Sequence, residues 1–263
     1  MSVTFSTASQ TTKAFVGRNI QLCVDQYDIS VQFHEVKHKR EAGVVDATGF
    51  GSTVEYALAA VQKASLEAKG FYAPDSQMDG IMVARLGQGA DVLGAYAPEG
   101  WALGLPVVMQ PSVLTKYDLD GKVKGGVEID VTMMARGAID DGKIMITPNV
   151  YTTTSGTSAV LDNTPNGGAT AAGGSAQLHV FGIDQTATSP TLNAKIQQST
   201  DLGTTWTDLF VFNAVTTTTT AQRMTLPKQQ PVGAQIRASW TISGAGATYV
   251  ALLGFCRGIP IIA

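Results

Sequence analysis

A strict alternation of apolar and polar residues in the middle of the chain constrains the fold most. Val127, Ile129, Val131 and Met133 alternate there with Glu128, Asp130 and Thr132. A strand places successive side chains on opposite faces of a sheet, so this stretch predicts a β-strand with one buried and one polar face. The same period of two runs through residues 64–72. It indicates a strand there too, although the Ala-rich residues before it have good helix propensity.

Other strands are predicted on both sides of this stretch. Alternating apolar residues at 20–24 mark a first strand, and a second begins near Ile29. The pattern of the second strand breaks near His34, where a β-bulge would redirect it and leave the charged run EVKHKRE facing solvent or a partner. The alternative interpretation is a solvated edge whose charges prevent stray pairing.

Two further patterns give a hairpin and a helix. The strands 113–119 and 122–134 are separated by Asp120-Gly121, a dipeptide that suits a two-residue hairpin turn. Apolar residues at helical spacing predict a helix over 75–87, which begins at Asp75 or Ser76 and ends at Gly87.

The C-terminal part reads as a second β-rich unit. Residues 151–175 are rich in Ser, Thr, Gly and Ala and predict a linker. Six short strands follow, near residues 178–183, 192–198, 209–212, 223–226, 236–242 and 249–256. Their spacing, with Trp206 and Trp240, predicts a β-sandwich with both tryptophans in its core.

The expected fold is therefore mainly β, in two domains. The first spans residues 1–150, with an N-terminal arm at 1–17, a flexible Gly-punctuated segment at 42–62 and the single helix. The second spans residues 176–263. At 263 residues the chain is long enough for both domains to bury a core.

Composition excludes some functions and favours assembly. Charged residues make up 15% of the chain, below the ~25% of an average soluble domain, which suits β-rich surfaces that pack against other protein. A net charge of -3 gives no general attraction to phosphates, so wrapping nucleic acid is not expected. The N-terminus lacks the pattern of a secretory signal, and no apolar run approaches the ~18 residues that span a membrane. We expect a protein that folds in a cytoplasm and does not enter a membrane.

The sequence offers no catalytic or metal-binding motif. His34 and His38 lie four residues apart, which on a strand is roughly 13 Å and too far for one zinc ion. His179 has no nucleophile motif beside it and is predicted to be structural. Residues 49–53 (GFGST) lack the Gly-Lys-Ser/Thr of a phosphate loop. We expect neither an enzyme nor a cofactor.

Two smaller patterns are interpreted as structural. Asp140-Asp141 precedes Gly142 and indicates a turn rather than an acid–base pair. Cys23 and Cys256 each lie in an apolar run, so buried thiols are favoured over a disulfide or a reactive thiol.

Several segments together resemble a known family. They are YDIS at 27–30, VDATGFGST at 45–53, KASLEAKGFY at 63–72, DSQMDGIMVARLG at 75–87 and GLPVVMQPSVLTKYDLDGKVKGGVEIDVTMMARG at 104–137. In this order they resemble the major tail proteins that build the tail tube of long-tailed bacteriophages. The segments at 193–212, 219–226, 236–244 and 255–258 resemble a β-sandwich appended to some of these proteins.

The resemblance implies a β-sandwich or barrel tube domain with one flanking helix. Subunits of this family close into rings, usually sixfold, which stack into a hollow tube through which the genome passes. Because the second half shows no segment like the predicted helix, the sequence favours one tube domain and a hexamer over two tube domains and a threefold ring. The expected location is the virion tail. The implied partners are further copies of the chain, a tape measure protein, tail terminator and distal tail proteins, and DNA that passes without specific binding.

Candidate residues follow from this resemblance and from charge. Inter-subunit or ring-stacking contacts are expected at Glu35, Lys37, Lys39, Arg40, Gly43, Val44, Asp46, Phe50 and Tyr56. A lumen that lets DNA slide requires acidic or neutral side chains, and the candidates are Glu128, Asp130 and Thr132. The alternative function is a capsid decoration protein or a virion protein that binds a host glycan. An accessory module of an enzyme is a third possibility.

Overall fold

The protein is mainly β, and its strands pair antiparallel. The computed structural model describes residues 20–46, 57–72, 78–89, 91–121, 126–152, 155–162, 173–184, 188–216 and 219–258. The strands of the first half are β1 (Gln21–Val24), β2 (Tyr27–Asp28), β3 (Phe33–Asp46), β4 (Ala57–Phe71), β5 (Val92–Ala97), β6 (Pro106–Gly121), β7 (Val127–Ala135) and β8 (Asp140–Tyr151). Those of the second half are β9 (Ser155–Thr157), β10 (Leu161–Asp162), β11 (Gly174–Ile183), β12 (Thr191–Ser199), β13 (Thr207–Val211), β14 (Thr220–Leu226), β15 (Gln235–Ser243) and β16 (Tyr249–Arg257). Among the described residues, α1 (Met78–Arg85) is the one α-helix, and η3 (Ser30–Gln32) is a single 3-10 turn.

Two sheets contain all of these strands. The larger follows the order β14-β11-β16-β8-β6-β5-β1-β2, and a branch from β6 adds β7, β4 and β3. The long β6 makes the branch possible, because its first residues pair with β5 and β8 and its last residues pair with β7. The smaller sheet has the order β10-β15-β12-β13, with β9 also on β15.

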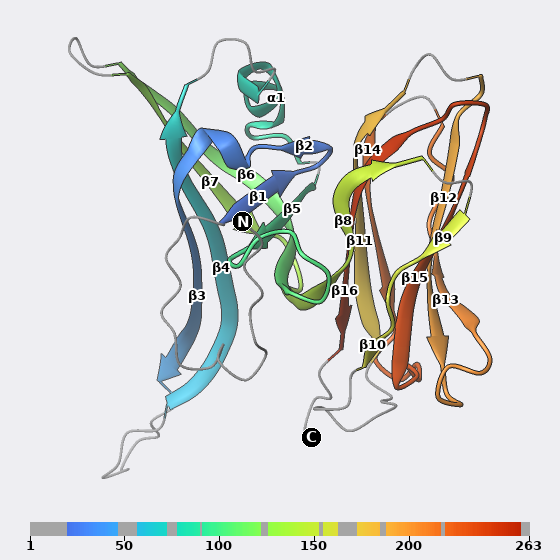
Figure 1. Ribbon diagram of the computed structural model, residues 1–263. Coiled ribbons are helices and arrows are strands. Elements are labelled where there is room, and N and C mark those ends of the chain that lie inside the picture. The colour runs from blue at the N-terminus through green and yellow to red at the C-terminus, as the bar shows by residue number, and fades with distance from the viewer. Residues whose placement is uncertain are drawn as a thin grey trace, which may run out of the picture.

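Three apolar clusters separate successive layers of strands. The first lies between β4-β7 and β1-β5 and includes Met82 of α1. The second lies between β1-β5-β6 and β16, and the third joins β8, β11 and β16 to the smaller sheet. Strands β1 and β16 are buried on both faces, which explains why Tyr249–Arg257 is almost continuously apolar. Figure 1 shows the resulting two lobes, with β1 to β7 and α1 in one and β9 to β16 in the other.

Many sequence predictions are confirmed. All six predicted C-terminal strands are present as β11 to β16. The alternation at 64–72 lies within β4, and Ile129, Val131 and Met133 are buried. The register between β3 and β4 shifts at His34, as the broken pattern predicted. Cys23 and Cys256 are buried free thiols, and burial raises the pKa of Cys256 to about 12.

The predicted helix is present but shorter in its described part. It ends where predicted, since Gly87 follows with a positive φ of 68°. Residues 73–77, with the candidate caps Asp75 and Ser76, lie outside the described residues. So does the N-terminal arm at 1–17.

Three predictions in the first half are wrong. Asp120 and Gly121 belong to β6 and pair with Glu128 and Val127, so the hairpin does not turn at this dipeptide. Asp140-Asp141 begins β8 and binds two arginines instead of forming a turn. The segment 42–62 is a strand pair wherever it is described, with Ala42 opposite Gln62 and Asp46 opposite Ala57. Cross-strand pairing there overrides the local preference of Gly and Ala.

Two predictions in the second half are also wrong. The segment 151–175 is not a plain linker, because β9 and β10 pair with β15 in its described part. Trp206 lies outside the sandwich core, with the Arg237 guanidinium 4.1 Å from its ring centroid. Trp240 does pack against the core cluster. Hydrogen bonding also crosses the expected domain boundary at 150, since β8 pairs with both β6 and β16.

Candidate assembly surface

The outward face of the β3-β4-β7-β6 branch carries half of the predicted site residues. Lys69 on β4 lies opposite Asp130 on β7, which lies opposite Asp118 on β6. On the other side, Glu35 of β3 is opposite Lys69. Alternate residues of four neighbouring strands therefore form one continuous polar face, while the residues between them point into the first apolar cluster.

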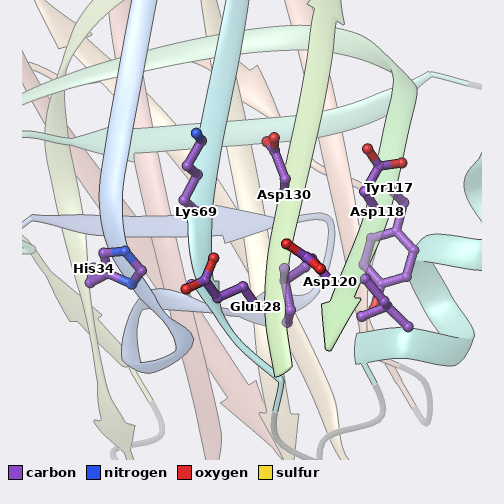
Figure 2. Close-up of a pocket in the computed structure, with 10 residues that line it drawn as sticks. His34, Lys69, Tyr117, Asp118, Asp120, Glu128 and Asp130 are labelled. Carbon is purple, nitrogen blue, oxygen red and sulfur yellow. The ribbon is translucent and has the colours of Figure 1, made fainter. Parts of the chain in front are cut away.

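Acidic side chains dominate one end of this polar face. Glu128 and Asp130 of β7 and Asp118 and Asp120 of β6 line an open hollow of about 620 Å³. His34 and Lys69 form its other side (Figure 2). The structure thus brings two of the predicted lumen residues, Glu128 and Asp130, to one place.

Lys116 lies within this acidic group and bridges two strands. Its Nζ is 2.7 Å from Asp130 and 3.0 Å from Asp118. The hydrogen bond to Asp130 is the main reason that the pKa of Lys116 is raised, so the lysine stays charged. The third predicted lumen residue, Thr132, is opposite Lys116 in the register.

Three predicted residues of β3 lie on the same polar face. Glu35 and Lys37 form an ion pair, which lowers the pKa of Glu35. Lys39 Nζ is 2.7 Å from Glu67 of β4. Both ion pairs are exposed, so each contributes little stability and leaves the charges accessible to a neighbouring molecule.

Arg40 is separated from these residues. It lies on the opposite face of β3, where its guanidinium binds the Asp141 carboxylate of β8 in a bidentate ion pair. Two residues earlier on that face, His38 Nε2 is 3.3 Å from Oε1 of Gln110. Arg40 therefore contacts the body of its own chain.

The strand pair continues beyond the branch as a two-stranded ribbon, defined here as residues 41–46 and 57–63. Pairing between β4 and β7 covers residues 65–71, whereas pairing between β3 and β4 extends to Asp46 and Ala57. The ribbon contains three of the predicted assembly residues, Gly43, Val44 and Asp46, all on β3. Phe50 and Tyr56 lie outside the described residues. In Figure 1 the ribbon runs past the end of β7.

Sequence reasoning missed several residues of this surface. Lys116, Asp118 and Asp120 alternate on β6 and share the face of Glu128 and Asp130. The period of two was visible, but the predicted turn at 120–121 cut the strand short. Asp141 was missed because its partner Arg40 lies 101 residues away.

Among the residues whose placement is described, no group of three or more His, Cys, Asp or Glu could hold a metal ion. In the same residues, no helix is both long and apolar enough to cross a membrane. His179 is buried, and its Nδ1 is 2.6 Å from the carbonyl oxygen of Asp25.

Comparison with known proteins gives distant structural similarity. No protein-family model and no curated protein matches the sequence. A chain of the virion of a native gene transfer agent particle is 19% identical, with a TM-score of 0.41, and the match covers 49% of this chain and 98% of that one. The Dit protein of phage SPP1 is 12% identical, with a TM-score of 0.33, covering 90% and 98%. A chain of the sheath–tube complex of an extracellular contractile injection system is 12% identical, with a TM-score of 0.39, covering 52% and 99%. At these values the similarities assign neither a family nor a function to this chain.

Proposed function

We propose that the chain is a structural subunit of a virion tail that polymerises into stacked rings and forms the tail tube, the conduit for the genome. The observation that carries this proposal is the polar-faced branch β3-β4-β7-β6 with the ribbon projecting from it. Among the described strands, the 14-residue β3 pairs with β4 alone, so its outer edge has no partner among them. Such an edge is an aggregation hazard unless another chain covers it, and a closed ring of subunits covers every copy.

The placement of the family-like segments supports the same proposal. The segments 63–72 and 104–137 form β4, β6 and β7, which pair with one another, and 75–87 contains α1. Met82 of α1 packs into the cluster beneath these strands. Three of the five segments that resemble the tube domain thus lie together in the structure.

The charge of the polar face suits a passage for DNA. Four carboxylates and one lysine, Lys69, line the acidic hollow, and a second lysine, Lys116, is paired with two of these carboxylates. A surplus of negative charge repels phosphates, so DNA facing these strands would slide rather than bind. We therefore assign Glu128, Asp130 and Thr132 to the lumen and the ribbon to contacts between rings. We further propose that six subunits close each ring and that the C-terminal lobe lies on the outside of the tube. The proposed partners are tape measure, tail terminator and distal tail proteins.

Electron microscopy of the purified full-length protein tests the proposal. Striated tubes with a central channel are expected as protein concentration rises, and averaged end views should have sixfold symmetry. Particles that remain monomeric at every concentration would refute a tube subunit. Monomers that bind glycans would instead support the alternative of a host-glycan-binding virion protein.

A further inference from the structure

The root of the ribbon is a defined point in the fold. Ser65, opposite Met134, is the last residue of β4 paired with β7 on this side. Beyond it, β3 and β4 pair with each other alone among the described strands. Arg40 is opposite Ala64 and therefore stands where the ribbon leaves the sheet.

Arg40 ties this root to β8. Its Nη1 is 2.6 Å from Oδ2 of Asp141, and Nη2 donates to Oδ1 of the same carboxylate. The two side chains are 39% and 55% exposed, as exposed as those of the Glu35–Lys37 pair, but a bidentate guanidinium–carboxylate pair fixes direction as well as distance. The pair also lowers the pKa of Asp141, so the carboxylate stays charged at neutral pH.

The preceding residue of β8 makes a second arginine contact on the other side. Asp140 Oδ2 is 2.9 Å from Nη2 of Arg223, which lies on β14. Successive residues of a strand point to opposite faces, so Asp140 and Asp141 face different neighbours. Asp140 is 8% exposed, and its ion pair with Arg223 is the more buried of the two.

We propose that Asp140 and Asp141 form a two-sided clamp that sets the direction of the ribbon relative to the C-terminal lobe. The Asp140–Arg223 pair anchors β8 to β14, and the Arg40–Asp141 pair holds the ribbon root against β8. Without the second pair, the ribbon pivots about residues 40 and 64 and meets the next ring in many orientations. The clamp thus regulates ring stacking. The effect on ring stacking rests on the proposed function, whereas the effect on the direction of the ribbon does not.

Charge reversal and charge exchange at the outer pair test the clamp. The variants are Arg40→Glu, Asp141→Arg and the double variant that carries both changes. Arg40→Lys is a milder variant that keeps the charge but loses the bidentate geometry. The control is Lys39→Gln, which removes an ion pair within the strand pair, to Glu67, without touching β8.

Hydrogen exchange of the unassembled full-length protein is the first measurement. In both charge-reversal variants, amides of the ribbon should exchange about tenfold faster, while those of β11 and β16 stay unchanged. Arg40→Lys should give an intermediate increase, and Lys39→Gln should match the wild type. The double variant should return ribbon exchange to within about threefold of the wild type.

The rate of tube elongation is the second measurement. Single reversals should slow elongation about tenfold, and the double variant should restore it. Unchanged ribbon exchange in both Arg40→Glu and Arg40→Lys would overturn the clamp, as would a double variant no better than the single ones. Faster ribbon exchange in a protein whose wild type never forms tubes would support the clamp and refute the proposed function.

Discussion

At the scale of single residues, the junction between the lobes depends on buried polar contacts. His179 of β11 is fully enclosed, and its Nδ1–H donates to the backbone carbonyl of Asp25, 2.6 Å away. Asp25 has a positive φ of 50°, and its Oδ1 accepts from the Leu93 amide. One turn between β1 and β2 thereby connects β5 of the first lobe with β11 of the second.

This junction predicts a loss of stability in mild acid. Burial lowers the pKa of His179 from 6.5 to about 4. Between pH 6.5 and 4, His179 is therefore protonated in the unfolded chain but neutral in the folded one. The free energy of unfolding falls as pH drops through this range. The loss amounts to roughly 3 kcal/mol at pH 4. Urea unfolding at several pH values measures it.

The matched variant is His179→Gln, which keeps a donor for the Asp25 carbonyl but does not titrate. Its stability should vary less between pH 6.5 and 4 than that of the wild type. Since all other groups are shared, the difference between the two curves isolates His179. Parallel curves would show that His179 is not responsible.

A second residue-scale prediction concerns the turn after β12. Asp201 accepts hydrogen bonds from the Thr205 amide and from Ser199 Oγ. Bonding to Thr205 is the main reason that its pKa is lowered to about 2. Its contribution is therefore present above pH 4 and is lost as pH falls towards 2. Asp201→Ala should lower the thermal midpoint at pH 7 but make little difference at pH 2. An equal shift at both pH values would contradict this assignment.

At the scale of elements, the backbone of the turn η3 comes close to β4 just before β3 begins. A Cβ added at Gly70 of β4 would lie 2.0 Å from the carbonyl oxygen of Gln32. Gly70→Ala should therefore destabilise the protein by about 1–3 kcal/mol. Gly80 in α1 has nothing within 4 Å of such a Cβ, so Gly80→Ala should raise stability by up to about 1 kcal/mol. Denaturant midpoints of the two variants should shift in opposite directions.

The ribbon gives the other prediction at this scale. Val44 and Ala59 are opposite each other, so replacing residues 45–58 with Asn-Gly would close a two-residue hairpin there. The shortened chain should fold with an unchanged melting temperature, because the ribbon lies beyond the pairing with β7. It should form rings that do not stack, as sedimentation and electron microscopy would report. Tubes of normal length from this variant would rule out the ribbon as the stacking element.

Local patterns predicted elements better than they predicted pairing. The six strands from β11 to β16 could be predicted because alternation and turn residues are local signals. The pairing of β8 with β16 could not, because Val150 and Val250 lie far apart in sequence. Trp206 was predicted in the core for a similar reason. The local sequence around a tryptophan does not show whether its ring packs in a core or, as here, against the guanidinium of Arg237.

In the candidate site, too, local patterns could be predicted from the sequence and long-range contacts could not. Glu128 and Asp130 could be assigned to a polar face from their period alone. Their neighbours Asp118 and Asp120 depended on the true length of β6, which a strong turn dipeptide obscured. Arg40 was assigned to subunit contacts from the resemblance and from its charge, and local sequence does not reveal its long-range partner Asp141.

At the scale of the whole molecule, the packing of successive layers of strands fixes the position of one lobe relative to the other. The second apolar cluster packs β16 against β1, β5 and β6, and β8 pairs across the lobes. The C-terminal lobe is therefore attached through a shared core and a shared sheet rather than through a tether. If the polar face lines a lumen, the C-terminal lobe, which lies on the other side of two apolar clusters, is placed outside the tube.

The charge of that polar face gives the last prediction. Changing Asp120 and Glu128 to Lys spares the Lys116–Asp130 ion pair and turns the acidic hollow basic. Tubes should still form, because both side chains project from the sheet surface. The variant tubes should retain short duplex DNA that wild-type tubes release, and retention should weaken steeply with salt, since phosphate binding releases counterions. Asp208→Lys, on β13 of the C-terminal lobe, is the control, and its tubes should retain no DNA inside. Equal DNA release by variant and wild-type tubes at low salt would place this face away from the lumen.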